Sequence, residues 1–126
     1  MTIRGLIEAV EAGEVGWNRL ATTAEDAIPP KEAALAATAY SGSLDAAKAL
    51  HDALLPGWWW AVGTCKVSDD ARVSPDDARR APGGGEWADY TDIDQRPPGN
   101  PARAWLLSIL IAVEGQAILR ALDGDA

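Results

Sequence analysis

Two side chains that commonly do chemistry occur once each in this chain, His51 and Cys65. A histidine acts as a general base only with a nucleophile or a carboxylate within reach, and the residues around His51 offer no Ser-His or Cys-His pairing. Cys65 has Lys66 beside it but no lysine cluster or helix N-terminus that would lower the pKa of its thiol, so we expect an inert, partly buried side chain. These residues predict no nucleophilic active site, and we expect a protein that is not an enzyme.

Acidic residues form the second group with possible chemistry. Asp89, Asp92 and Asp94 could ligate a hard cation through their carboxylates, and Glu86 lies a little upstream. The glycine and the closing glutamate of an EF-hand loop are missing, so solvated turn residues explain the cluster more simply. The run Gly83–Gly85 lacks the lysine and the following helix of a phosphate-binding loop and predicts a linker. We therefore expect no metal and no cofactor.

The run Trp58-Trp59-Trp60 is the strongest pointer to a binding surface. Adjacent strand residues point to opposite faces, so we expect Trp58 and Trp60 to be buried on one face and Trp59 to lie on the other. Helices on both sides of the strand would cover all three indoles; otherwise at least one indole is left to anchor a partner or stack on a ligand. The residues that could form such a contact surface are Trp58, Trp59, Trp60, Trp87, Tyr90, Arg72, Arg79 and Arg80.

Composition and charge narrow the class of partner. The chain has 126 residues, a net charge of −8 and a pI near 4.4. Nucleic-acid binding needs clustered basic residues, whereas the eleven Lys and Arg residues here are scattered, so we expect no direct contact with nucleic acid. A single cysteine excludes an internal disulfide and a zinc site built from cysteines. The N-terminal residues show no signal-peptide pattern, and we expect a cytoplasmic protein without a membrane segment.

Hydrophobic periodicity of 3.6 residues predicts the helices that must position these side chains. The last helix begins with Asn100 as N-cap and Pro101 at the first helical position. Its two apolar stripes indicate cover on two sides, so we expect it to be the core helix, with Leu106, Leu110 and Val113 fully buried. The expected helices lie between Thr2 and Gly13 and over Lys31–Tyr40, Leu44–Leu55 and Asn100–Leu122. The buried face expected for the third of them consists of Leu44, Ala47, Leu50 and Leu54.

Between the third and fourth helices the apolar period changes to two, which predicts strands. The expected strands are Trp58–Cys65, Ala71–Val73 and Glu86–Thr91, with a turn at Ser68-Asp69-Asp70, a flexible loop over Ser74–Gly85 (74–85) and a polar connection over Asp92–Pro98. The sequence thus predicts one α+β domain over residues 1–126, with an N-terminal helical part (1–42) and a helix-strands-helix core (43–122). About three antiparallel strands would be covered by helices on both sides, as in an α/β/α sandwich.

Two motifs, SLDAAKALHDALLPGWWWAV and NPARAWLLSILIAVE, carry a resemblance to a known family, which covers roughly Ser43–Val62 and Asn100–Leu122. They resemble small phage and prophage proteins that are described as a phage α-β-α sandwich domain. The resemblance implies the fold and a phage or prophage origin. It implies no activity and no site residue, because the family has no assigned function.

Three functions follow as hypotheses. The first is a non-enzymatic phage accessory protein that binds a host protein, as an anti-CRISPR-like inhibitor of a bacterial defence system does. The second is an oligomeric sponge for a nucleotide immune signal, in which indoles stack on bases and Arg72, Arg79 or Arg80 meets the phosphates. The third is a metal-dependent hydrolase that uses the Asp89–Asp94 cluster.

Overall fold

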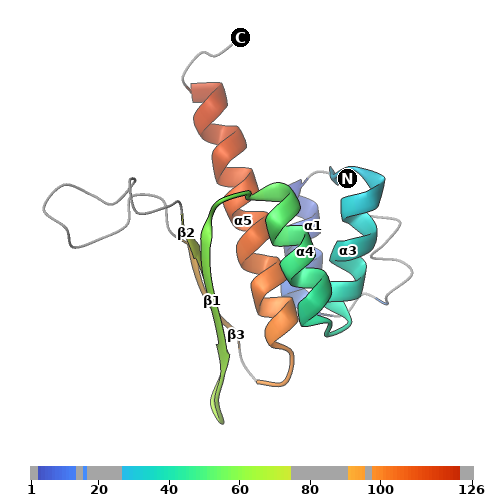
Figure 1. The fold of residues 1–126 in the computed structure, drawn as a ribbon, viewed down its shortest axis with the longest axis vertical. Coiled ribbons are helices and arrows are strands. Elements are labelled where there is room, and N and C mark those ends of the chain that lie inside the picture. The colour runs from blue at the N-terminus through green and yellow to red at the C-terminus, as the bar shows by residue number, and fades with distance from the viewer. Residues whose placement is uncertain (1–2, 14–15, 17–26, 75–90, 96–97, 123–126) are drawn as a thin grey trace, which may run out of the picture.

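The computed structural model describes residues 3–13, 16, 27–74, 91–95 and 98–122. It confirms an α+β fold, in which four described helices accompany a three-stranded antiparallel sheet and the longest helix comes last (Figure 1). The elements are α1 (Ile3–Ala12), α3 (Pro30–Tyr40), α4 (Leu44–Leu54), β1 (Trp59–Thr64), β2 (Asp69–Ser74), β3 (Thr91–Gln95) and α5 (Pro101–Leu122).

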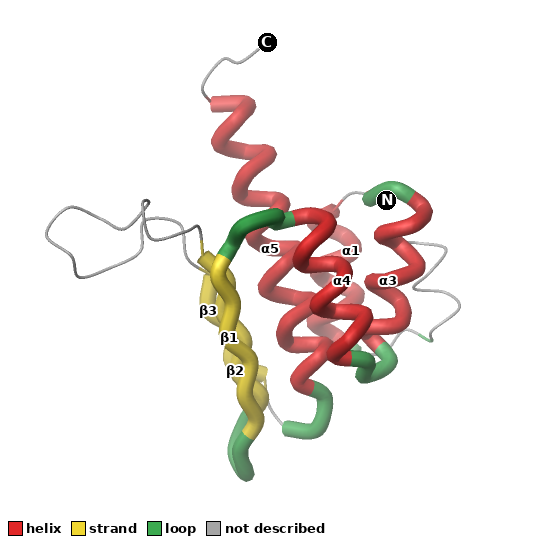
Figure 2. The backbone as a smooth tube through the Cα atoms, viewed as in Figure 1, coloured by secondary structure: helices red, strands yellow, loops and turns green. Residues whose placement is uncertain are grey.

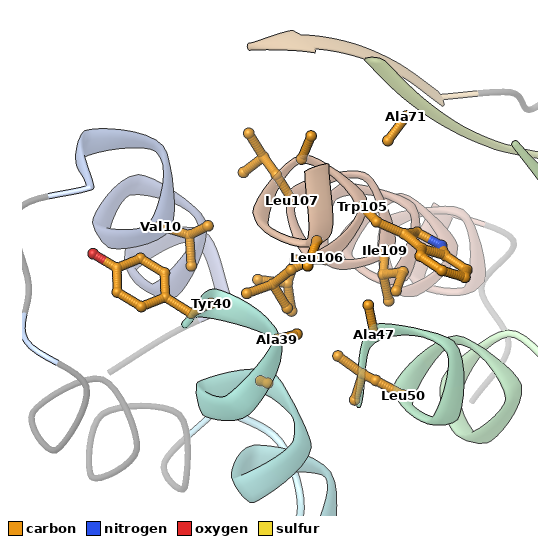
Figure 3. Close-up of a cluster of buried hydrophobic side chains, with 14 of the residues drawn as sticks. Val10, Ala39, Tyr40, Ala47, Leu50, Ala71, Trp105, Leu106, Leu107 and Ile109 are labelled. Atoms are coloured by element: carbon orange, nitrogen blue, oxygen red, sulfur yellow. The ribbon is translucent and has the colours of Figure 1, made fainter. Parts of the chain in front are cut away.

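Helix α5 is the centre of the molecule, as its two apolar stripes predict. It contacts all three strands on one side and α1, α3 and α4 on the other. In Figure 3, Leu106 and Ile109 point from α5 toward α3 and α4, while Leu107 lies on the side of the sheet. Figure 2 shows that the described helices all lie on one side of the sheet. The layers are therefore sheet, α5, and the remaining helices, and the expected second helical cover of the sheet is not found among the described residues.

The start of α5 is fixed by the cap that the sequence predicts. The side-chain oxygen of Asn100 accepts the N–H of Arg103 at 3.0 Å, and the side-chain amide of Asn100 donates to the carbonyl of Tyr40 at 3.0 Å. Leu106 and Leu110 are fully buried, as expected. The prediction for Val113 is wrong, since this side chain is only partly buried. The reason is that the C-terminal end of α5 extends beyond the sheet and the other helices (Figure 1).

Helix α4 begins as predicted but is rotated relative to the expected face. Ser43 caps it by accepting the N–H of Ala46 at 3.1 Å. The buried residues are Ala46, Ala47, Leu50 and His51. Leu44, predicted to be buried, is 46% exposed, because the first turn of α4 lies at the rim of a groove that no described element fills.

The sheet has the order β1-β2-β3, with both pairs antiparallel. Strand β2 starts at Asp69, where a turn was predicted, and runs on to Ser74, the first residue of the predicted loop. Residues 92–95 belong to β3 and do not form the polar connection that the sequence indicates. Pairing with β2, which places Ile93 opposite Ala71, overrides the low strand propensity of the aspartates in this segment. The predicted third strand over Glu86–Thr91 shares only Thr91 with β3, and its other residues lie outside the described ranges, as does 75–85 of the predicted loop.

Among the described residues no helix is both long enough and apolar enough to cross a membrane.

Candidate binding site beside the edge strand

Strand β1 carries two of the three consecutive tryptophans and lies at an edge of the described sheet. Its register places Trp60 opposite Val73 and Trp59 opposite Ser74, so the two indoles lie on opposite faces. Trp60 faces α5, and Trp58, which precedes the strand, packs against the core. Both were expected to be buried, but Trp58 is only half-buried and Trp60 is 38% exposed. Trp59, on the face away from α5, is 45% exposed.

Trp60 remains exposed because it lines a groove between β1 and α4, which we call the β1–α4 groove. The groove has a volume of about 490 Å³, within the range of ligand and side-chain pockets. One wall is the first turns of α4, the other is β1, and the floor is the start of α5. The lining residues are Leu44, Asp45, Lys48, Trp60, Val62, Gly63, Thr64, Pro101 and Trp105.

The floor of the groove is an aromatic stack. The rings of Trp60 and Trp105 lie 4.4 Å apart with an angle of 29° between their planes. Trp105 is buried and Trp60 lies over it, so the exposed indole is held by a partner that belongs to the core helix. This arrangement presents a rigid apolar surface rather than a mobile side chain.

His51 is buried beside the stack and contacts the rings of both Trp60 and Trp105. Its Nε2 lies 3.1 Å from the carbonyl oxygen of Trp58, which can only accept, so Nε2 carries the proton. Its Nδ1 therefore accepts the indole N–H of Trp105, at 3.4 Å. Burial lowers the pKa of His51, against the opposing effect of the Trp58 carbonyl. Both ring nitrogens thus help to hold the chain just before β1 against α5.

Asp69 fixes the far end of the groove. This buried carboxylate accepts the hydroxyl of Thr64 at 2.6 Å and the backbone N–H groups of Gly99 and Asn100 at 3.0 and 2.7 Å. Burial by itself would raise its pKa, but these hydrogen bonds and the charge of Arg103 leave the pKa below its usual value. Asp69 therefore ties the end of the β1–β2 hairpin to the start of α5. The sequence indicated only a solvated turn residue here.

Of the other predicted contact residues only Arg72 is described, and it shares the outer face of the sheet with Trp59 and not with Trp60. Arg72 lies on the face of the sheet away from α5, where its guanidinium is 3.6 Å from the carboxylate of Asp70. It is therefore on the opposite side of the sheet from Trp60. Trp87, Tyr90, Arg79 and Arg80 lie outside the described residues.

Cys65 differs from the sequence expectation. The thiol is exposed at the turn between β1 and β2, not partly buried. The backbone N–H groups of Val67 and Ser68 lower its pKa, and that of Val67 lies 3.4 Å from the sulfur. The turn geometry that brings these donors to the sulfur has no local sequence signal.

Only two of the four residues of the acidic cluster fall within the described residues. Asp92 and Asp94 are two positions apart in β3, while Glu86 and Asp89 lie outside the described residues. Within the described ranges, no group of three or more His, Cys, Asp or Glu side chains is placed to hold a metal ion.

Searches against protein-family models, curated proteins and solved structures found no match to this chain. The resemblance to phage α-β-α sandwich proteins therefore stays a prediction from the sequence.

Proposed function

We propose that this chain is a non-enzymatic phage or prophage protein that binds a host protein through β1. We further propose that it acts in the host cytoplasm, where it inhibits a component of a defence system. The observation that carries the binding proposal is the exposure of Trp59 and Trp60 on opposite faces of one edge strand. Tryptophan is usually well buried, and an exposed tryptophan on a rigid support is a strong interface anchor.

Three further features support the proposal. The net charge of −8 favours a basic partner surface and disfavours nucleic acid. The phage origin rests on the resemblance carried by Ser43–Val62 and Asn100–Leu122. The engagement of both ring nitrogens of His51 in structural hydrogen bonds supports a protein that acts by occupying a surface.

The test is capture of a host protein by the purified full chain, followed by titration of the identified protein. Trp59→Ala is expected to weaken binding by about 2 kcal/mol or more, roughly 30-fold, as loss of an anchor does. Ile118→Ala, at an exposed apolar residue of α5, is the matched control and should bind like the parent chain. Equal affinities of Trp59→Ala and Ile118→Ala would contradict the role of β1.

A nucleotide sponge is the second candidate, and the Trp60–Trp105 stack in the β1–α4 groove favours it. A base could stack on Trp60, but Lys48 is the only described cation that lines the groove, and it pairs with Asp52 at 2.7 Å. Native mass spectrometry of the chain purified from a bacterial host separates the two functions. A retained nucleotide supports the sponge, and a retained protein supports the inhibitor.

A further inference from the structure

We infer that the β1–α4 groove and the outer edge of β1 together bind an extended segment of a partner protein, which is apolar at alternate residues and basic. The segment adds to the sheet as a strand next to β1. This inference rests on the proposed function and names the site and the chemistry of the bound segment.

The hydrogen-bond pattern shows which backbone groups β1 offers. In an antiparallel pair, successive residues alternate between those bonded to the neighbouring strand and those whose N–H and C=O point away from it. The N–H of Cys65 donates to the carbonyl of Ser68 at 3.0 Å, which continues the register of the Thr64–Asp69 pair. Counting back by twos, the outward-pointing groups belong to Trp60, Val62 and Thr64. The carbonyl of Trp58 follows the same alternation, because it points to His51 on α4 and not into the sheet.

The outer edge of β1 lacks the usual protection against pairing. Exposed edges in monomeric proteins are commonly blunted by lysine, proline, a bulge or a charge that points inward. Strand β1 reads WWAVGT and contains no charged residue and no proline, and its register with β2 runs without a bulge. Among the described segments, none pairs with the outer edge of Trp60, Val62 and Thr64.

The edge and the groove fit one occupant. The residues with outward-pointing backbone groups, Trp60, Val62 and Thr64, are also those whose side chains line the groove. The backbone of Gly63 lines it too, so the edge itself forms part of the wall. A strand laid along this edge would place every second side chain over the Trp60–Trp105 stack, between β1 and α4. Main-chain hydrogen bonds would supply affinity, and the apolar floor would select the alternate side chains.

Charge decides which kind of segment fits. Of the two charged residues that line the groove, Lys48 is paired with Asp52, whereas Asp45 has no ion pair among the described residues. A basic side chain in the bound segment would meet Asp45. A second copy of this chain is the less favoured occupant, because it would bring another net charge of −8 to the same seam.

The test uses random 12-residue peptides displayed on yeast and selected on the full chain. Enriched peptides are expected to alternate apolar residues and to carry Lys or Arg. Val62→Pro removes an outward N–H, and Val62→Ala is the matched control that loses the side chain but keeps the N–H. We expect Val62→Pro to weaken peptide binding at least tenfold relative to Val62→Ala, with both variants folded by circular dichroism. In the parent chain, the amides of Trp60, Val62 and Thr64 should exchange more slowly with solvent when peptide is bound.

Four outcomes would overturn the inference: no enrichment on the parent chain over Val62→Pro, enrichment of acidic peptides, unchanged exchange at these three amides, or a dimer whose amides are protected without peptide. The last would assign the edge to a second copy. Amide exchange is measured on the parent chain and needs no variant. It therefore tests the inference even if Val62→Pro fails to fold. A host protein that needs Trp59 while no peptide protects these amides would refute this inference and leave the proposed function standing.

Discussion

Helix α5 and strand β1 are both apolar, yet they have opposite surroundings. Residues 104–110 of α5 are all buried, with the sheet on one side and three helices on the other. Among the described segments, β1 has α5 on one face only and one strand neighbour, and none of its own residues is buried. Apolar side chains therefore have different roles in the two elements. In α5 their buried area stabilises the fold, whereas in β1 part of it stays exposed to solvent.

The two regions are joined by a few specific contacts. Trp105 of α5 stacks on Trp60 of β1, His51 bridges Trp105 to the backbone of Trp58, and Asp69 binds the turn before α5. These contacts fix the exposed strand on the core without covering it. Substitutions in the core should therefore cost stability, whereas substitutions on the exposed side of β1 should cost binding.

The largest expected effect is in α5. Leu110→Ala removes a fully buried side chain and should lower the free energy of unfolding by about 2–5 kcal/mol, as in other cores. Ile118→Ala on the same helix removes a side chain that is 52% exposed and should stay within about 0.5 kcal/mol of the parent. Urea unfolding followed by circular dichroism measures both. Equal costs would mean that α5 is not the core.

The next largest effect on stability is expected at Asp69, which ties the β1–β2 hairpin to the start of α5. Asp69→Asn replaces a carboxylate that accepts three hydrogen bonds with an amide whose one oxygen accepts two, and should cost about 1–3 kcal/mol. Because the pKa of Asp69 is lowered in the folded state, its contribution is present above the unfolded pKa of about 3.9 and is lost as pH falls through the folded value. Between pH 7 and acid pH, the free energy of unfolding should fall less for Asp69→Asn than for the parent. Asp70→Asn, at an exposed pair, is the control.

His51 gives a smaller effect in a separate pH window. Its pKa is lowered by burial, so the unfolded chain takes up a proton first. Its contribution is complete above the unfolded pKa of about 6.5 and declines as pH falls below that value. Protonation would also place an N–H against the indole N–H of Trp105. The parent should lose more stability than His51→Gln between pH 7.5 and pH 5; equal losses would contradict a lowered pKa of His51 in the folded chain.

The fold could be predicted largely from local patterns. The Asn100 cap and the helices expected over Lys31–Tyr40 and Leu44–Leu55 are each contained in a short stretch of sequence, and each appears where it was expected. The change of period at Trp58 located β1 for the same reason. Strand β3 was missed because its aspartates have low strand propensity, and only pairing with β2, far away in sequence, makes the segment extended.

The candidate site could be predicted only in part. The alternation of Trp59 and Trp60 follows from strand geometry, but which face stays open depends on how the helices pack. Because strand geometry alone does not show which face stays open, the sequence predicted helices on both sides of β1. The groove combines the first turn of α4 with residues of β1 and α5, and Leu44 and Lys48 gave no local signal of it. The burial of Asp69 likewise depends on the turn at Gly99, thirty positions along the chain.

The most direct test of the central claim is the accessibility of the individual indoles. The chain can be labelled with 5-fluorotryptophan, and its six fluorine resonances can be assigned with single Trp→Phe variants. A soluble nitroxide should broaden the Trp59 and Trp60 resonances strongly and leave the Trp105 resonance sharp, in agreement with their burial. A Trp59 resonance as well shielded as that of Trp105 in the free monomer would contradict the claim that β1 is the exposed binding strand.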